Sequence, residues 1–275
     1  MVDQPGFFEL IGFFHDALVV SLLTGAILGP VGLFLHLRGS LFLGAALPQF
    51  AGFGFVVASV LAIPEWIASS VTIVFFAVAA AFKPLRKFDG MTLEAMIGLG
   101  YTAAMGGIVL LLSLTKAEGH AAELLLKGSM LAATCRDTQI LSWFGVPLVL
   151  LLYLFRRRFY LVSLDPETAG TMGIRVEIYE IVLFAALGMA IMLTLTEAGA
   201  MACFGFLLLP PLIALTLCRR VGTLFLASMT IGAVGAISGV CLALKTDLPV
   251  GPAMVLALLC LWLAALVFRG VRKPS

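Results

Sequence analysis

Few residues of this sequence have both a reactive side chain and a spacing that could form a metal-binding or other functional site. His120 and Glu123 lie three residues apart, so one face of a helix would carry an imidazole and a carboxylate, both ligands for transition metals. A solvated loop is the stronger interpretation of this pair. Glu197 ends an apolar run, where a carboxylate is costly and often functional. For Glu197 a position at the membrane interface and a functional position are equally supported.

A third group of polar residues, SLDPETAGTMGIR (163–175), predicts a short helix over about 165–174. Asp165 can accept hydrogen bonds at the helix N-terminus, and Pro166 suits the first helical position. Glu167 lies in the first turn, where the helix dipole favours an acid. Gly173 is a suitable residue to end the helix.

Within this predicted helix, Ala169 and Gly170 are expected to be exposed and to form a shallow surface. The triple arginine at 156–158 precedes the segment and would anchor it beside a membrane. An ordinary surface loop is the alternative, and for a membrane protein in general it is the stronger interpretation of the residue types alone.

The composition decides the class of protein that must position these groups. Of 275 residues, 62% are hydrophobic and 12% are charged, against about half apolar and a quarter charged in soluble domains. We therefore predict an all-α, polytopic transmembrane bundle in a single domain, 1–275. A net charge of +2 with no basic tail gives no indication of nucleic-acid binding. The acidic N-terminus lacks Lys and Arg, so no cleaved signal is expected.

Apolar runs long enough to cross a bilayer predict eight or nine spans. The second and third are separated only by a short turn, and the segment 120–137 could be an interfacial or a re-entrant helix. The predicted spans are 14–37, 46–62, 66–83, 95–115, 138–156, 178–197, 200–218, 223–243 and 250–268.

The basic residues predict how these spans are oriented. With nine spans, 13 of the 17 lysines and arginines fall in one set of loops and four in the other. Because cytoplasmic loops carry the excess of Lys and Arg, the N-terminus is expected outside and the C-terminus in the cytosol. The 165–174 segment then faces the cytosol.

Small residues four apart predict close helix packing rather than a ligand site. The pairs are Gly25 with Gly29, Gly232 with Ala236, and Gly235 with Gly239. The five cysteines stand in apolar contexts without a CxxC pair, so they are expected to be small buried hydrophobic residues.

Several of these segments resemble, in the same order, the ABC-3 family of permeases, the metal-type ABC importers for zinc, manganese or iron. VSLDPETAGTMGI resembles the cytoplasmic coupling loop of that family, and the similarity runs from about residue 14 to 268. The other similar segments are LRGSLFLGAALPQFAGFGFVVA (37–58), GHAAELLLKGSMLAAT (119–134), EAGAMACFGFLLLPPLIALTLCRR (197–220) and DLPVGPAMVLA (247–257).

The resemblance implies a transport subunit, not an enzyme, in a bacterial plasma (inner) membrane. The chain has no Gly-Lys-Ser or Gly-Lys-Thr of a P-loop, so ATP would be hydrolysed by a separate cytosolic ATPase docked on 165–174. A second permease copy, identical or not, and an extracytoplasmic binding protein would complete the importer. No cofactor is expected on this chain; zinc, manganese or iron would be cargo.

One departure from the family pattern concerns the metal. Members usually carry an Asp and a His four residues apart at the start of the second span, whereas this chain has Ala45 and Gln49. Three readings remain: ligands from the paired subunit, a pathway lined by neutral groups, or a cargo that is not a bare metal ion. The pathway implied by the resemblance follows Ala45, Pro48, Gln49, Glu197, Pro210 and Pro211.

Pro210 and Pro211 are expected to kink or hinge the seventh span, since proline removes a helical hydrogen bond.

Two other classes of function fit less well. An intramembrane enzyme needs paired catalytic groups at membrane depth, which the spans lack. An ion-coupled secondary transporter or channel favours buried acids and an inverted repeat, and only Glu197 comes close.

Overall fold

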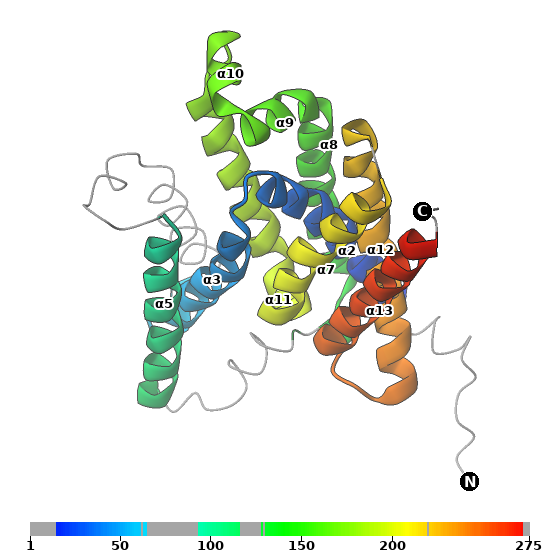
Figure 1. Cartoon of the computed structure of the whole chain (residues 1–275). Coiled ribbons are helices and arrows are strands. Elements are labelled where there is room, and N and C mark those ends of the chain that lie inside the picture. The colour runs from blue at the N-terminus through cyan, green and yellow to red at the C-terminus, as the bar shows by residue number, and fades with distance from the viewer. Residues whose placement is uncertain are drawn as a thin grey trace.

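The computed structural model describes residues 15–61, 63–64, 93–115, 128, 130–218 and 220–271, which form helices and short turns without a β-strand (Figure 1). This confirms the predicted all-α class. The long helices are α2 (His15–Leu37), α3 (Leu41–Leu61), α5 (Leu93–Thr115), α11 (Val176–Leu217), α12 (Val221–Thr246) and α13 (Val250–Val271). The shorter ones are η2 (Met130–Ala132), α7 (Cys135–Ile140), η3 (Leu141–Gly145), α8 (Val146–Leu154), α9 (Arg156–Leu164) and α10 (Pro166–Thr171).

Within the described residues, seven helices are long and apolar enough to cross a membrane. Six are the long helices. The seventh is the continuous helix Cys135–Leu154, which consists of α7, the π-helical turn η3 and α8. The predicted spans agree with these helices to within about five residues at each end. The predicted span 66–83 lies outside the described residues, so the total of eight or nine and the orientation stay predictions.

Helix α11 is two limbs joined at a sharp bend. Its 42 residues would extend about 63 Å if straight, roughly twice the apolar thickness of a bilayer. Gly199 breaks it with φ 79° and ψ 160°, angles that a residue with a side chain rarely adopts. Across the bend, Thr194 Oγ1 lies 3.5 Å from Cys203 Sγ, although the two residues are nine apart. The bend falls between the predicted spans 178–197 and 200–218.

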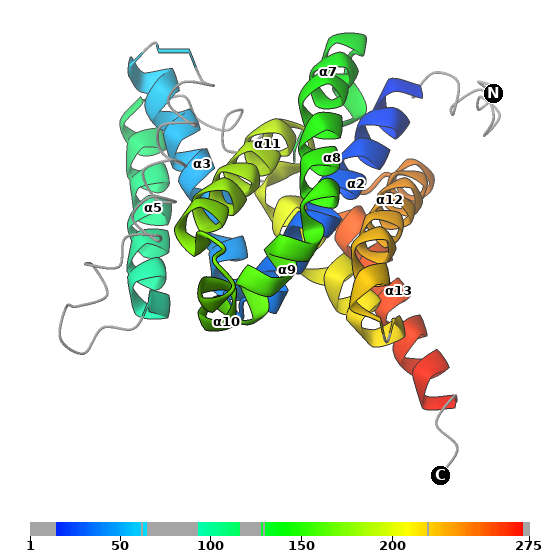
Figure 2. The same cartoon turned by 90° about the horizontal axis from the view of Figure 1, so that it is seen from above.

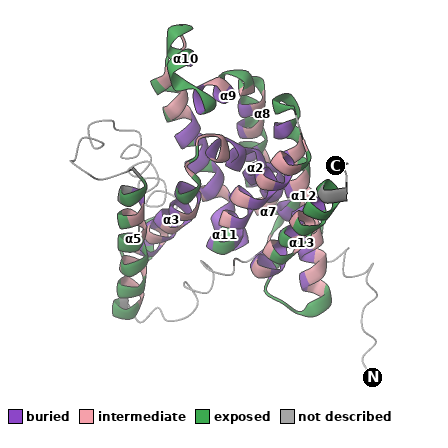
Figure 3. Cartoon of the chain, in the orientation of Figure 1, coloured by how far each residue is buried: buried purple, intermediate pink, exposed green. Residues whose placement is uncertain are grey.

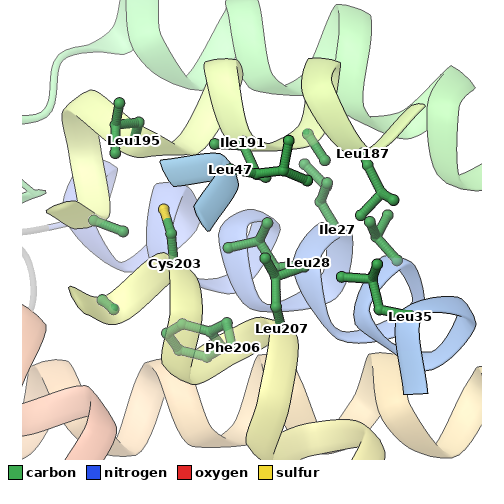
Figure 4. Packing of buried hydrophobic residues seen from close by; sticks show 14 of the residues in the cluster. Ile27, Leu28, Leu35, Leu47, Leu187, Ile191, Leu195, Cys203, Phe206 and Leu207 are labelled. Carbon is green, nitrogen blue, oxygen red and sulfur yellow. The ribbon is translucent and has the colours of Figure 1, made fainter. Parts of the chain in front are cut away.

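Helix α2 is the centre of the bundle. Most of its residues are buried, and it packs mainly against α12 and α11 (Figure 3). In Figure 4, Ile27 and Leu28 of α2 lie between the two limbs of α11, which contribute Ile191 from one side and Leu207 from the other. The central helix therefore fills the angle that the bend of α11 opens.

Glycines allow α12 to approach α2 at backbone distance. A Cβ on Gly25 would overlap the carbonyl group of Gly232, and a Cβ on Gly232 would overlap that of Gly25. One turn further along α2, a Cβ on Gly29 would overlap the carbonyl group of Ser228. The packing role predicted for these small residues is confirmed.

The next pair of small residues has the same role between α12 and α13. A Cβ on Gly235 would overlap the side chain of Leu258, and one on Gly239 would overlap Met254. On the other side of the bundle, α5 packs mainly against α3, where the rings of Phe42 and Tyr101 lie 6.0 Å apart. Helix α5 is thus attached to the bundle largely through α3 (Figure 1).

We expect Gly25→Ala to destabilise the fold by about 1–3 kcal/mol, because the new methyl group must push the α12 backbone away. Gly106→Ala on α5 is the matched control, since a Cβ there meets no atom within 4 Å. The helix propensity of alanine favours both changes by about 1 kcal/mol, so only packing separates them. Thermal unfolding in detergent would measure the difference, and equal melting temperatures would contradict the account of the α2–α12 contact.

Candidate functional site

The first candidate site is the short helix α10 at one end of the bundle, called here the α10 end (Figure 1). Asp165 is its N-cap: Oδ1 accepts from the Thr168 N–H at 3.0 Å, and Oδ2 accepts from Thr168 Oγ1 at 2.5 Å. These bonds hold the pKa of the Asp165 carboxyl below its ordinary value. Pro166 occupies the first turn and Glu167 is exposed beside it. The predicted start of the helix is confirmed.

The other end of α10 is closed by glycine. Gly173 has φ 78°, its N–H donates to the Gly170 carbonyl at 3.1 Å, and the Ile174 N–H donates to the Ala169 carbonyl at 3.1 Å. This pair of bonds is the Schellman arrangement, which needs a left-handed residue at the position of Gly173. The predicted stop is confirmed, and α10 with both its caps occupies 165–174.

The surface of α10 differs from the sequence-based expectation at one residue. Ala169 was expected to be exposed with Gly170, but it is fully buried and faces the rest of the chain. Gly170 is exposed, and a Cβ there would meet nothing within 4 Å. The sequence reasoning overlooked Leu164 and Met172, which flank α10 and are 54% and 68% exposed. Figure 3 shows α10 mostly exposed, at the end of a bundle whose buried residues are concentrated at its centre, on α2 and α11.

Helix α9 connects α10 to the core through aromatic rings. Phe159 and Tyr160 of α9 lie 5.6 and 5.5 Å from the ring of Phe34 on α2. Phe159 also contacts Tyr179 of α11 edge to face at 5.4 Å, and Arg158 donates to the Tyr179 hydroxyl at 2.6 Å. Helices α9 and α10 therefore form an arm, residues 156–171, that is attached to both α2 and α11.

A salt bridge joins α2 and α11 at the same end. Arg38, just after α2, pairs with Glu180 in the first turns of α11, and both side chains are largely buried, at 14% and 16% exposure. The Arg38 guanidinium also lies over the Phe184 ring, 5.1 Å from its centroid. Because the partners are 142 residues apart in sequence, this contact fixes the turn after α2 to the helix that follows α10.

The second candidate site is the face of α3 that carries Ala45 and Gln49. The two are one helical turn apart and half-buried, while Pro48 between them is buried. Phe42 and Phe53 lie on the same stripe and contact α5, at Tyr101 and at Gly107 respectively. The Ala45–Gln49 stripe thus lies along the α3–α5 contact.

This stripe offers only neutral groups. Gln49 contributes an amide, and the facing part of α5 carries the Tyr101 phenol. Within the described residues, no three His, Cys, Asp or Glu side chains gather closely enough to hold a metal. His120 and Glu123, the sequence-predicted metal pair, lie outside the described residues.

Glu197 lies at the bend of α11, at the end of the bundle away from α10. Its side chain is only 8% exposed, and Oε2 has no hydrogen-bond partner among the described residues. Gly128 presses on the bend: a Cβ there would overlap the backbone of residues 197–199. Glu197 is therefore largely buried, where the segment before α7 meets the bend of α11.

Pro210 and Pro211 are buried inside the second limb of α11, as expected, but the marked break in that helix is at Gly199. The limb keeps helical backbone angles through both prolines. Since Pro211 has no N–H, the Leu207 carbonyl lacks its helical donor. A Cβ on Gly32 of α2 would overlap this carbonyl. The prolines thus free backbone for a close helix contact.

Comparison with known proteins decides the family. Residues 11–269 match the model of the ABC 3 transport family. The chain belongs to this family. Its members are membrane-spanning permease subunits of ABC importers and are not enzymes themselves, so the family predicted from the sequence and the transport function are confirmed.

Relatives and solved structures match over most of their length. The chain is 27% identical over 259 residues to "Manganese transport system membrane protein MntC" of Halalkalibacterium halodurans, covering 93% of this chain and 87% of that one. It is 24% identical over 260 residues to "Chelated iron transport system membrane protein YfeD" of Yersinia pestis, covering 94% and 86%. The solved structure "PsaBC from Streptococcus pneumoniae in complex with Fab" has the same fold, with a TM-score of 0.84, 21% identity and 94% of each chain covered.

The Arg38–Glu180 pair gives a prediction for stability. Arg38→Met or Glu180→Leu alone should cost about 3 kcal/mol, because each leaves one buried charge without its partner. The double variant should cost less than the sum of the two single changes, since no buried charge remains. Thermal unfolding of the four proteins in detergent measures the coupling free energy, and additive losses would contradict the pairing.

Proposed function

We propose that this permease moves a transition metal (zinc, manganese or iron) into the cell. A separate cytosolic ATPase that docks on α10 would drive this transport. The observation that carries this proposal is the capped, exposed helix α10 on an arm attached to the bundle core. A second permease copy and an extracytoplasmic binding protein would complete the importer. The orientation predicted from the basic residues supports it, since it turns α10 toward the cytosol.

The surface of α10 supports a docking role. Glu167 and Gly170 are exposed on the helix, and the flanking Leu164 and Met172 are exposed although they are apolar. Outside a membrane, grouped apolar side chains mark a surface that another protein covers. Methionine suits a contact that must adapt during movement, because its side chain is flexible.

The arm supports transmission of the motion of an ATPase. A push on α10 reaches α2 through Phe159 and Tyr160, and reaches α11 through Arg158 and Tyr179. Rigid-body rotation of packed helices of this kind is a common way for a domain to switch between two arrangements. The bundle would open alternately to the two sides of the membrane.

The cargo is argued from the relatives and from the α3 stripe. The relatives' names specify manganese and chelated iron, which supports a metal. Ala45 and Gln49 contribute no strong ligand, and the α5 groups beside them are neutral. This favours a metal that crosses with ligands of its own, or one held by groups of the second permease copy, over a bare ion held by this stripe.

The test is ATP hydrolysis by the permease reconstituted in vesicles with its ATPase and binding protein. We expect hydrolysis to rise severalfold with one of Zn²⁺, Mn²⁺ or Fe²⁺, added as the free ion or as a soluble chelate, and to be accompanied by uptake of that metal. Stimulation by the chelate alone would support the cargo with its own ligands.

Gln49→Ala tests whether Gln49 is a ligand of the metal or whether the α3 stripe only needs to be neutral. If the stripe only needs to be neutral, uptake should change less than about threefold; if Gln49 is a ligand, it should fall at least about tenfold, as for loss of a metal contact. Ala103→Ser on the exposed face of α5 is a control for substitution itself.

In the ATP-hydrolysis test, a lack of stimulation by every metal, free or chelated, would contradict a metal as the cargo.

A further inference from the structure

Helices α2, α8 and α12 lie side by side on one side of the bundle (Figure 2). An apolar pocket lies between them. Its volume is about 340 Å³, within the range of small-molecule sites in proteins. The lining is almost wholly apolar, with side chains that include Ile27 from α2, Val149 from α8 and Met229 from α12. It lies away from the α3 stripe, so the proposed function makes no use of it.

The pocket has a buried floor and an open rim. Ile27 and Phe225 on the floor are 1% and 0% exposed, whereas Leu22, Leu150 and Leu226 on the rim are 40%, 53% and 48% exposed. All these residues belong to helices that can span a membrane. The rim therefore opens into the apolar layer of the bilayer, where the surrounding solvent is lipid acyl chain.

A local change of helix geometry helps to form the pocket. The π-helical turn η3 ends at Gly145, which lines the pocket where α8 begins. A Cβ on Gly145 would overlap the tip of the Ile27 side chain, so the lack of a side chain at Gly145 leaves room for Ile27 in its present position between α8 and α2. Such π-helical turns are often found at functional sites.

Positive charge lies at one end of this pocket. Tyr153 lines it at the last turn of α8, and Arg156 stacks on the Tyr153 ring, 4.0 Å from the centroid, while donating to the Tyr153 carbonyl at 3.0 Å. Arg157 follows and is exposed, and its side chain makes no hydrogen bond or ion pair within the part of the chain that the structure describes. Arg220 stands just before α12, which lines the opposite wall.

Negative charge is absent from these pocket helices near that end. Between Gln139 and Leu164, and between Arg220 and Thr246, the sequence contains no Asp or Glu. An apolar slot in the membrane with arginines at its cytosolic end complements an anionic headgroup on an acyl chain. The uncharged rim gives no such complementarity to a protein segment.

We propose that this pocket binds one anionic phospholipid of the cytoplasmic leaflet, with an acyl chain between α2, α8 and α12 and its phosphate near Arg156 and Arg157. The lipid would fill the space that the π-helical turn opens. Because α9 begins at Arg156, the headgroup would also hold the base of the arm that carries α10. Activity of the importer would then depend on the content of anionic lipid.

The test uses the full-length permease in vesicles of equal parts phosphatidylglycerol and phosphatidylethanolamine with the same acyl chains. After gentle extraction, native mass spectrometry counts the lipids retained. We expect one phosphatidylglycerol per wild-type chain. Arg157→Gln should lower its retention relative to phosphatidylethanolamine about fivefold, the effect of one arginine near an anionic surface. Arg269→Gln, at the exposed end of α13, is the matched control.

A second variant tests the acyl slot without altering charge. Leu150→Trp should lower the retention of both lipids severalfold, because the larger ring occupies the pocket, while Leu151→Trp, exposed on the same helix but outside the pocket, should not. The proposal is overturned if Arg157→Gln leaves the ratio of the two lipids unchanged or if Leu150→Trp retains as much lipid as Leu151→Trp. It is equally overturned if a cysteine in place of Leu150 crosslinks two copies of the chain, since the pocket would then be a protein interface.

Discussion

The backbone contact between α2 and α12 is the constraint on which the rest of the bundle depends. Gly25 and Gly232 each occupy the place where the other would carry a side chain, so the two helices meet in a single register. With α12 held there, the bent α11 encloses α2 from the other side, and the Leu207 carbonyl reaches Gly32. A membrane bundle cannot rely on the exclusion of water from its apolar faces, so contacts this close carry much of its stability.

The same central helix links the two candidate sites. One end of α2 carries Phe34 and is followed by Arg38, which hold the α9–α10 arm and the start of α11. Helix α3, with its neutral stripe, begins three residues after Arg38 and packs on the limbs of α11. In the proposed mechanism, movement of α10 would be passed to a group of helices that share buried aromatic and ionic contacts, and α3 would receive it through Arg38 and α11.

Much of this could be predicted from the sequence, because the decisive signals are local. Apolar runs gave the spans, small residues four apart gave the glycine contacts, and Asp-Pro with a later glycine gave α10 and its caps. Contacts between residues far apart in sequence could not be predicted, such as Arg38 with Glu180. Ala169 was wrongly expected to be exposed, because its burial depends on how the arm folds back. The turn predicted between spans 178–197 and 200–218 lies at Gly199, whereas the kink expected at Pro210 and Pro211 is not seen, because the limb keeps helical angles there. The expectation that all five cysteines are buried was also wrong, since Cys135 and Cys260 are exposed.

The most direct test of the account is the position of α10 relative to the membrane and its partner. With the exposed Cys135 and Cys260 replaced by serine, a cysteine at Thr168 should react with a membrane-impermeant maleimide only in inverted vesicles. Bound ATPase should protect it, while a cysteine at Lys245, at the opposite end of the bundle, should react only in right-side-out vesicles. Labelling of residue 168 from the outside would contradict the account, as would labelling from the inside that the ATPase leaves unchanged.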